Sequence, residues 1–434
     1  MPDAKKRILF LHPSAELTGD SRPLVELAQK LGSEGWESIF VLPRQGPLAA
    51  ALEGPGARVE IGPVGVLRRT RGLRDLARLG VEIARAAVFT WRLARRLRPD
   101  VVQTNGRRVV GGALGAKLSG APHVWHVLDT PERPSRIPAF ARLFDALADR
   151  VVCNYYATAR PFVDARPRLR ARAQVVWEGT AAPMPMSREK ARCELGLDPH
   201  KPCVVLVGDV EGWKGQELLV RAARLMRPSH PDAHYILVGE TRPGEEHLAR
   251  ELKAAIREAG LGDAVELRPL RRDLSTLYAA ADVVVVPHGL PEPLGQGTID
   301  AAALARPVVA AADGGSAETV LYGETGLLFD PGDPADLAEA LGRLLGNLDE
   351  ARRMGRAARL RQLEDFTLQR YYARLEAVYR ELVEDATSTR PRLAIPAAAR
   401  QLAELTPADE PTRGVLPSAA PPVEASDGER AKRA

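Results

Sequence analysis

Residues 281–330 read ADVVVVPHGLPEPLGQGTIDAAALARPVVAAADGGSAETVLYGETGLLFD, and this stretch decides the fold. Residues 283–286 are four consecutive valines, which is typical of a strand buried on both faces of a parallel sheet. Pro287 ends the run. Residues 288–297 are rich in Gly and Pro, and residues 298–304 continue with a short apolar helical pattern. The order predicted from the pattern is therefore strand, loop, helix.

The predicted turn between this strand and this helix is suited to an anion. Gly295, Gln296 and Gly297 fall at the helix N-terminus, where backbone N–H groups lack helical partners and the helix dipole favours negative charge. The two glycines leave the approach to the backbone open. We therefore expect the chemistry around residues 288–300.

Apolar runs alternate with helical patterns along most of the chain. The first series of predicted strands covers residues 7–12, 38–42, 59–61, 101–104, 124–127, 151–154 and 175–177. The second series covers residues 204–207, 235–238, 265–267, 283–286, 308–310 and 326–329. Helical patterns lie between them at residues 23–31, 73–97, 110–118, 139–147, 216–226, 248–259 and 334–345. This alternation favours two doubly wound parallel sheets that face each other across a cleft, with ligands beyond the carboxyl ends of the strands.

The length of 434 residues allows two separate hydrophobic cores. We expect an N-terminal domain over residues 1–185 and a second domain over residues 186–365. A looser region at residues 181–202 precedes the second series of strands. Residues 366–385 predict an amphipathic helix that packs on a domain. Residues 386–434 are rich in Pro, Ala, Ser and charge, which predicts a disordered tail.

The three cysteines indicate the cellular compartment and argue against disulfide and zinc sites. Cys153, Cys193 and Cys203 are an odd number without metal-type spacing, so they favour neither a disulfide framework nor a zinc site and are typical of a reducing cytoplasm. The first apolar run is too short for a signal peptide, and no stretch approaches the roughly 20 apolar residues of a membrane span.

Positive charge is concentrated in the first part of the chain. The net charge is +5, but residues 1–180 carry 29 Lys and Arg against 17 Asp and Glu. Residues 67–98 hold ten arginines among apolar side chains. Two interpretations stay open for this segment: a solvated helix face, or peripheral contact with an anionic membrane at its inner face. No nucleic-acid recognition motif accompanies the charge.

A second turn between strand and helix lies at residues 205–219, VLVGDVEGWKGQELL. The strand ends at Gly208 and the next helix begins near Gly215, with Lys214 directly before it. A lysine in such a turn can neutralise a phosphate. Taken alone, Lys214 and the loop carboxylate of Glu292 are typical of solvated side chains.

Three patterns together resemble those of the retaining nucleotide-sugar glycosyltransferases of family 4, which have the GT-B fold of two Rossmann-like domains. The patterns are G-D-V-x-x-x-K-G, P-E-P-L-G-x-G-x-x-D and R-P-V-V-A…G-G-x-x-E…G-x-T-G-L-L-F-D-P-G-D. The resemblance covers residues 5–382 and is strongest over residues 203–340. It implies that the helix near residues 366–382 crosses back to the first domain.

The resemblance implies a role for individual residues. Lys214 matches the lysine that binds the donor diphosphate, Glu292 the glutamate beside the donor sugar, and Asp300 the residue that holds the ribose. His126 matches a histidine near the reacting carbon, and Glu318 an acid with a structural role. The implied catalytic set is Glu292, Lys214 and His126; the donor-binding set is Gly208, Asp209, Lys214, Leu294, Gly295, Gln296 and Asp300; and the acceptor or phosphate loop is Thr18, Gly19 and Arg22.

The chain departs from the family pattern at several of these positions. Asp209 stands where the family has an arginine, so one diphosphate cation is replaced by an acid, a charge that Arg22 or Arg242 could restore. Asp300 replaces a glutamate, and Thr18 replaces the first glycine of the acceptor loop.

The implied activity is transfer of a sugar from a UDP- or GDP-linked donor to a hydroxyl acceptor, with retention of configuration. The implied acceptor is a glycan or a lipid-linked molecule, in polysaccharide or glycolipid assembly. We expect no cofactor and no metal, since the chain contains no Asp-x-Asp. A nucleotide-sugar epimerase and a non-catalytic glycan- or partner-binding protein stay open as alternatives. A nicotinamide dehydrogenase is disfavoured because no G-x-G-x-x-G follows the first strand.

Overall fold

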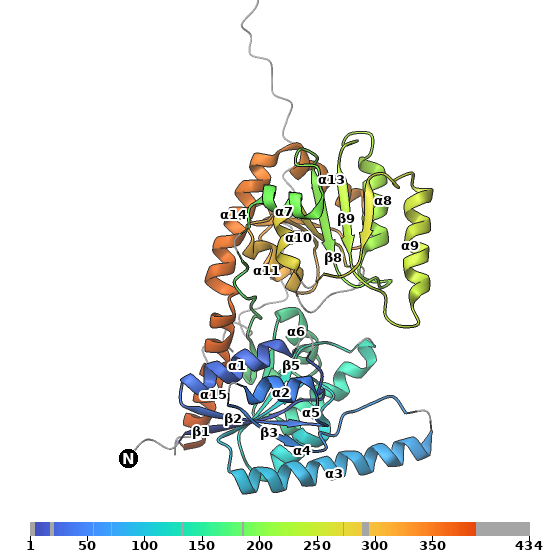
Figure 1. The fold of residues 1–434 in the computed structure, drawn as a ribbon. Helices are drawn as coiled ribbons and strands as arrows, with labels where there is room; N and C mark the ends of the chain where they lie inside the picture. The colour runs from blue at the N-terminus through green and yellow to red at the C-terminus, as the bar shows by residue number, and fades with distance from the viewer. Residues whose placement is uncertain are drawn as a thin grey trace, which may run out of the picture.

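The computed structural model describes residues 5–17, 21–54, 56–70, 72–131, 133–184, 186–271, 273–288 and 295–387. These residues form two α/β domains (Figure 1). Within them, one sheet has seven strands in the order β3-β2-β1-β4-β5-β6-β7, and the other has six in the order β10-β9-β8-β11-β12-β13. The neighbouring strands pair in parallel throughout, as in β1 with β4 and β8 with β11. The predicted GT-B architecture of two doubly wound sheets is confirmed.

The first domain contains β1 (Lys6–Leu11), β2 (Trp36–Leu42), β3 (Arg58–Ile61), β4 (Val101–Asn105), β5 (His123–Val127), β6 (Arg150–Cys153) and β7 (Ala173–Val175). Its helices are α1 (Arg22–Ser33), α2 (Pro47–Glu53), α3 (Leu73–Leu97), α4 (Val110–Ser119), α5 (Ile137–Leu147) and α6 (Tyr156–Ala165), with short 3₁₀ turns at Pro134–Arg136 and Pro167–Ala171. The strand predicted at residues 175–177 ends two residues earlier. Val176 is fully buried beyond it and still donates its N–H to the Cys153 carbonyl at 2.9 Å, which explains the apolar signal.

The second domain contains β8 (Cys203–Val207), β9 (His234–Val238), β10 (Val265–Arg268), β11 (Val283–Val286), β12 (Val308–Ala311) and β13 (Gly326–Phe329). Its helices are α7 (Arg188–Leu195), α8 (Gln216–Met226), α9 (Glu246–Glu258), α10 (Leu274–Ala280), α11 (Gln296–Ala303), α12 (Ser316–Thr319), α13 (Pro334–Gly346) and α14 (Leu348–Asp365). The expectation of a loose region at residues 181–202 is wrong in part, because α7 forms there. Ser187 caps α7 by accepting a hydrogen bond from the Lys190 N–H at 3.2 Å.

The last described helix, α15 (Leu368–Thr387), returns to the first domain. In Figure 1 it descends from the second domain along the side of the first. Leu375, Val378 and Tyr379 are fully buried in the core that also holds Phe10 and Phe40. The predicted crossing helix is therefore confirmed, and the tail predicted beyond it lies outside the described residues.

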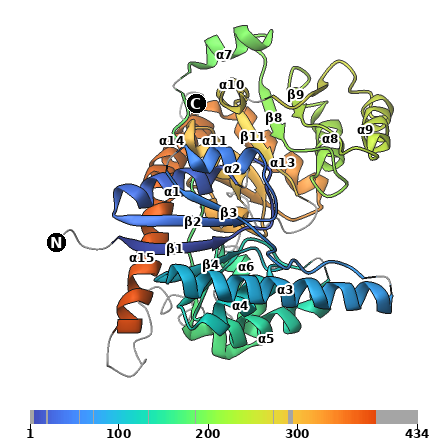
Figure 2. The same ribbon diagram turned by 60° about the horizontal axis from the view of Figure 1, so that its bottom comes forward.

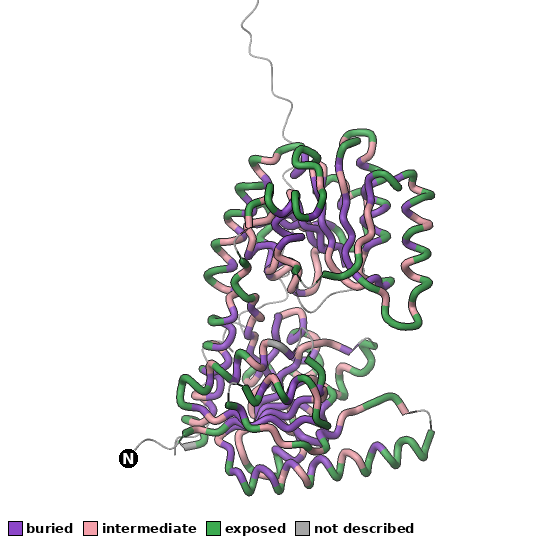
Figure 3. Tube along the Cα trace, in the orientation of Figure 1, coloured by how far each residue is buried: buried purple, intermediate pink, exposed green. Residues whose placement is uncertain are grey.

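Burial follows the layers of the two domains. Figure 3 shows most of the strands buried, while the surrounding helices carry many exposed residues. The edge strand β3 differs, since none of its four residues is buried. The four valines of β11 are among the buried residues, as the opening stretch predicts. None of the described helices is long and apolar enough to cross a membrane.

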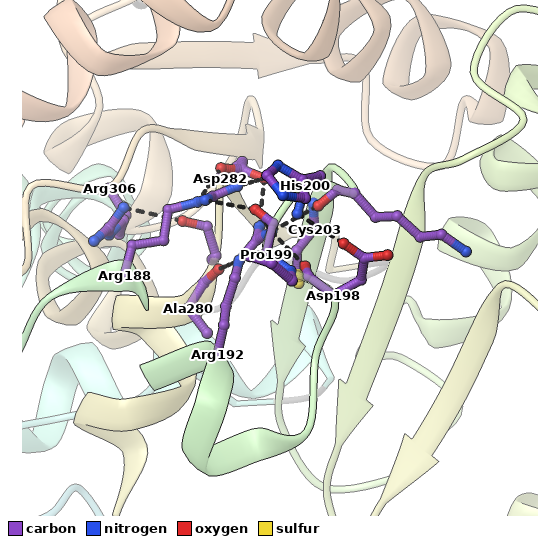
Figure 4. A network of polar contacts seen from close by, with 11 residues as sticks. Arg188, Arg192, Asp198, Pro199, His200, Cys203, Ala280, Asp282 and Arg306 are labelled. Atoms are coloured by element: carbon purple, nitrogen blue, oxygen red, sulfur yellow. Dashed lines mark hydrogen bonds and ion pairs between the residues drawn. The ribbon is translucent and has the colours of Figure 1, made fainter. Parts of the chain in front are cut away.

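An ion-pair network fixes the amino ends of β8 and β11 (Figure 4). Asp282, one residue before β11, accepts hydrogen bonds from the Arg192 guanidinium at 2.6 Å and from the Cys203 N–H of β8 at 2.9 Å. Arg188 adds a further ion pair to Asp282 at 2.8 Å. The Arg192 side chain is 1% exposed and also donates to four backbone carbonyls. The strands that lead to the candidate site are thus held firmly at their opposite ends.

Candidate active site

The loop after β8 places Lys214 at the carboxyl edge of the second sheet. The Lys214 N–H donates to the Glu211 carbonyl at 3.1 Å, and the Lys214 Nζ lies 4.2 Å from the centre of the Trp213 ring. Gln216, at the start of α8, donates its side-chain amide to the carbonyls of Gly208 and Asp209 at 3.1 and 2.8 Å. The loop is therefore held in a defined turn, with the lysine folded over its first residues.

The same loop packs directly on the end of β11. Gly215 has φ +80°, and a Cβ there would lie 1.7 Å from the Pro287 carbonyl oxygen, so only glycine fits. His288 follows Pro287, and its ring centre lies 5.7 Å from that of Trp213. Burial and the nearby Lys214 charge lower the pKa of His288 to about 3, so its imidazole is neutral near pH 7. The loop after β8 thus packs against the end of β11, at Pro287 and His288.

The helix predicted after β11 is α11, and it begins at the position expected for an anion site. Its hydrogen bonds start with the Thr298 N–H, which donates to the Gly295 carbonyl at 3.1 Å, so the N–H groups of Gln296 and Gly297 have no acceptor within the helix. Gln296 donates its side-chain amide to Asp300 Oδ1 at 2.8 Å. The Thr180 hydroxyl also donates to the Asp300 carboxylate.

Asp300 is held in an unusual electrostatic state. Burial raises its pKa to about 6, although the hydrogen bonds from Thr180 and Gln296 favour its charged form. Thr180 belongs to the segment that joins the two domains. Asp300 therefore lies beside that segment, where a ligand between the domains would meet it.

The first domain contributes a buried polar chain at the ends of its strands. His126 Nε2 lies 2.9 Å from Asn154 Oδ1, and the Asn154 amide donates to Glu178 Oε2 at 3.3 Å. Burial lowers the pKa of His126 to about 4, so it is neutral near pH 7 and its Nε2 donates to Asn154. A small cavity of about 20 Å³ lies beside His126 and Glu178 and is large enough for one water molecule.

Contacts between the domains bring these two edges together. Glu318 of α12 accepts hydrogen bonds from the Tyr156 and Ala157 N–H groups at the start of α6, at 3.0 and 2.7 Å. It also accepts one from the Trp177 indole at 3.0 Å. Figure 1 shows α6 and α11 on facing sides of the two domains. Burial raises the pKa of Glu318, while these N–H donors lower it, and its role here is to cap a helix of the opposite domain.

Several predicted residues fall outside the described part of the chain. Glu292 and Leu294 lie there, as do Thr18 and Gly19. Arg22 is the first residue of α1, but its side chain is not among the described ones. The structure brings together Gly208, Asp209, Lys214, Gly295, Gln296 and Asp300 on the second domain and places His126 on the first.

Arg242, considered above as a replacement cation, has a carboxylate partner. Its guanidinium lies 2.6 Å from Glu211 Oε1. Glu211 is buried in the loop that also holds Lys214, so this ion pair supports the loop. Among the described residues, no group of three His, Cys, Asp or Glu side chains could hold a metal ion.

Sequence reasoning did not identify Asn154 and Glu178 as site residues, and it included His288 only as the first residue of the stretch 288–300. Asn154 directly follows the apolar run of β6, and His288 follows the end of β11, so a polar residue after a buried strand was the available signal. No such signal marks Glu178, because its contact with Asn154 depends on how the last strands of the first sheet pack.

Comparison with known proteins gives consistent results. Residues 187–361 match the glycosyl transferases group 1 family. A D-inositol 3-phosphate glycosyltransferase of Nocardia farcinica is 38% identical over 234 residues, which cover 52% of this chain and 51% of that protein. One from Paenarthrobacter aurescens is 31% identical over 296 residues, which cover 63% of this chain and 71% of that protein. The chain spans about half the length of several such relatives.

The fold also matches solved structures. Anabaena HepE in complex with UDP aligns with a TM-score of 0.73 and 25% identity, over 86% of this chain and all of that one. The likeness extends over both α/β domains, so it is more than a match of one Rossmann-like half.

Proposed function

Because this chain belongs to the glycosyl transferases of group 1, we propose that it transfers a sugar from a nucleotide diphosphate sugar to a hydroxyl acceptor, with retention of configuration. The observation that carries the proposal is the arrangement of the loop after β8, the end of β11 and the start of α11. It presents Lys214 and the N-terminus of α11 at the carboxyl edge of the second sheet. UDP- and GDP-linked sugars are the donor class that such an edge suits.

The donor diphosphate would lie against Lys214 and the start of α11. The ammonium group and the backbone N–H groups stabilise the charge that develops as the diphosphate leaves. Asp209 adds a negative charge to the same loop. Its backbone carbonyl accepts a hydrogen bond from the Gln216 side chain. Gly208 has no side chain, which leaves the backbone open beside the lysine.

The nucleotide ribose would be held by Asp300. Gln296 fixes the Asp300 carboxylate at 2.8 Å, so the carboxylate is oriented before the ribose binds. The transferred sugar would lie toward His126, which is neutral and fixed by Asn154. Glu292 and Leu294 are proposed neighbours of the sugar from the family pattern, and Thr18, Gly19 and Arg22 would form the loop on the acceptor side.

In the proposed reaction, the acceptor oxygen forms a bond to the anomeric carbon on the face from which the diphosphate departs. The bond between that carbon and the phosphate oxygen breaks, and the departing oxygen takes the acceptor proton. Configuration is therefore retained, and the products are the glycosylated acceptor and a nucleoside diphosphate. Lys214 binds the leaving group and acts by charge.

A donor screen tests this proposal. The full chain is incubated with UDP- and GDP-sugars, and the products are followed by mass spectrometry. We expect one donor to release its nucleoside diphosphate. Release should be slow when water is the only acceptor and faster when a hydroxyl acceptor is present. An isomerised sugar with donor alone would indicate an epimerase. Binding of neither UDP nor GDP would favour a non-catalytic protein and contradict the proposal.

The proposed acceptor is a glycan or a lipid-linked molecule at the inner face of a membrane. The proposed contact with that membrane is α3. Figures 1 and 2 show α3 running out beyond the rest of the first domain. Leu73, Leu76 and Val81 are 85%, 55% and 59% exposed on it, among many arginines. An exposed helix with apolar and cationic side chains suits an anionic surface. The cytoplasmic location stays a prediction.

Vesicle co-sedimentation tests the contact with α3. Phosphatidylcholine vesicles with phosphatidylglycerol should retain the chain, and vesicles without it should not. The double substitution Leu73→Ser/Leu76→Ser should weaken retention several-fold. A matched pair on α14, Leu360→Ser/Leu363→Ser, removes similarly exposed leucines and should have no effect. Equal retention of all variants would remove the basis for the contact.

A further inference from the structure

The short segment that joins the two domains contacts both halves of the candidate site. We call residues 178–180, Glu178-Gly179-Thr180, the linker segment. The Asn154 amide donates to Glu178 Oε2 at 3.3 Å, and the Thr180 hydroxyl donates to the Asp300 carboxylate. Only Gly179 separates these two contacts along the chain. The linker segment therefore reaches the first domain with one side chain and the second domain with another, two residues later.

The junction of α14 and α15 fixes the backbone of the linker segment. The Thr180 N–H donates to the Phe366 carbonyl at 2.9 Å, and Thr180 pairs with Thr367 in a parallel bridge. Gly179 packs so closely on this junction that a Cβ on it would lie 2.4 Å from the Thr367 carbonyl oxygen. Because the backbone is held in this way, the side chains on either side of Gly179 leave it in defined directions.

On the donor side, Thr180 supplies one of two hydrogen bonds that orient Asp300. The other comes from the Gln296 side-chain amide, which donates to Asp300 Oδ1 at 2.8 Å. Gln296 and Asp300 belong to the same helix, α11, whereas Thr180 reaches the carboxylate from the linker segment. Donors from two separate elements fix the plane of a carboxylate, because rotation about its last bond would break at least one hydrogen bond.

On the first domain, Glu178 fixes the amide of Asn154. Because the Asn154 nitrogen donates to Glu178, the Asn154 oxygen faces His126 Nε2, at 2.9 Å. Burial lowers the pKa of His126 to about 4, so near pH 7 its ring carries a single proton. That proton must lie on Nε2 for the ring to donate to Asn154, which leaves Nδ1 as an acceptor. Glu178 therefore sets, through Asn154, which ring nitrogen of His126 is protonated.

We propose that the linker segment is a positioning element of the active site. Thr180 directs Asp300 toward the ribose of the donor, and Glu178 sets the orientation of His126 beside the transferred sugar. This inference rests on the proposed function and adds two positioning residues to it. Both act through another side chain. Since they lie on one fixed backbone, the ribose contact and the sugar contact are held at a set separation, as transfer within a defined geometry requires.

The first test measures how Thr180 affects recognition of the ribose. UDP and 2′-deoxy-UDP, or the guanine pair if GDP is preferred, are titrated by calorimetry into the full chain and its variants. Thr180→Val removes the hydroxyl and keeps a similar shape, and Thr180→Ser restores a hydroxyl. The matched control, Thr90→Val, makes the same chemical change at a fully buried position of α3.

We expect Thr180→Val to weaken binding of the ribonucleotide about three- to ten-fold and that of the deoxynucleotide less, so that the preference for ribose falls. Thr180→Ser and Thr90→Val should keep both affinities within about two-fold. In an Asp300→Ala background, Thr180→Val should cause no further loss, because its hydroxyl acts through that carboxylate. An unchanged preference for ribose in Thr180→Val, or an equal loss in the Asp300→Ala background, would overturn the role of Thr180.

The second test measures turnover of the donor found by the screen, because Glu178 acts on the sugar side. Glu178→Ala removes the acceptor of the Asn154 amide, whereas Glu178→Gln keeps an acceptor oxygen. We expect kcat to fall about ten-fold in Glu178→Ala and to recover to within about three-fold in Glu178→Gln. Affinity for the nucleoside diphosphate should stay within about two-fold in both variants. An unchanged kcat in Glu178→Ala, or a loss of nucleotide affinity as large as the loss of kcat, would contradict the role of Glu178.

These measurements separate the positioning roles from the function on which they rest. If the unaltered chain binds neither UDP nor GDP, the proposed function fails and the positioning roles fail with it. If the unaltered chain binds a nucleotide and turns over a donor while Thr180→Val and Glu178→Ala behave like Thr90→Val, the proposed function stands and the inference about the linker segment alone is overturned.

Discussion

Asp300 shows how a residue of the proposed donor site affects stability. Burial raises its pKa to about 6, above its value in the unfolded chain, so the folded state binds the proton more tightly. A carboxyl with a raised pKa lowers stability as the pH increases from about 4 through 6, because the folded state must bury a charge. A shift of this size is worth on the order of 2–3 kcal/mol.

Replacing Asp300 by Asn should therefore stabilise the protein in a pH-dependent way. Above about pH 6 the Asp300→Asn variant should have the higher thermal midpoint, and near pH 4 the two midpoints should converge. Differential scanning calorimetry at several pH values measures this. Asp349→Asn, at a side chain 93% exposed, is the control and should not change the midpoint at either pH. A difference independent of pH would contradict the assigned pKa.

At the residue scale, the sequence predicts which residues lie in the candidate site better than it predicts their protonation states. Lys214 and Asp300 were placed by their motif, and the i, i+4 spacing of Gln296 and Asp300 is visible in the chain. The pKa of Asp300 was not predictable, because it depends on burial and on Thr180, which lies far away in the sequence. The same limit applies to His126, whose neutrality follows from burial beside Asn154.

At the scale of elements, the network around Asp282 holds β8 and β11 in register. Removing its carboxylate in Asp282→Ala would leave Arg192 buried without its ion pair and the Cys203 N–H without its acceptor. The free energy of unfolding should fall by about 3–5 kcal/mol. Urea denaturation followed by circular dichroism measures the loss.

The matched control is Asp349→Ala. Asp349 pairs with Arg352 at 3.0 Å on the surface, and such exposed pairs contribute less than about 1 kcal/mol. If Asp282→Ala costs no more than this control, Asp282 does not anchor the two strands.

The sequence also predicts some helices and strands more accurately than others. Strands with apolar runs, such as β8 and β11, were found close to their bounds because burial on both faces requires continuous apolar residues. The helix α7 was missed because its eight residues are mostly charged and only one side of it is apolar. Ala191 and Leu195 supply the buried contacts, too few to give a clear periodic pattern.

At the scale of the whole molecule, the segment between the domains passes against the start of the returning helix. Thr180 pairs with Thr367 in a bridge, and its N–H donates to the Phe366 carbonyl at 2.9 Å. A Cβ on Gly179 would lie 2.4 Å from the Thr367 carbonyl oxygen. The close approach of these two backbones therefore requires glycine at this position.

Gly179→Ala should consequently destabilise the protein by about 1–3 kcal/mol, because one of the two backbones must move. Gly32→Ala in α1 is the control, since a Cβ there meets nothing within 4 Å and alanine favours a helix. Thermal unfolding of both variants measures the difference. An unchanged midpoint in Gly179→Ala would show that the crossing is looser than the structure indicates.

The alternation of strands and helices predicts two α/β domains, but not how they meet. The contact of Glu318 with the start of α6 joins residues from separate domains, and no spacing in the sequence reveals it. The cavity lined by Arg68, Arg69, Arg107, Arg108, Arg133 and Arg136 is similar, because its three segments converge only through the order of the strands in the first sheet. The charge of the first domain was visible in the sequence, but its concentration in one cavity was not.

The central claim is that the carboxyl edge of the second sheet binds the diphosphate of a nucleotide sugar. Calorimetric titration of UDP and GDP into the full chain, Lys214→Ala and the surface control Lys253→Ala tests it most directly. Loss of a charged hydrogen-bond donor should weaken binding of the preferred nucleotide about 10- to 150-fold in Lys214→Ala and leave Lys253→Ala unchanged. Equal affinity in all three proteins would contradict the claim.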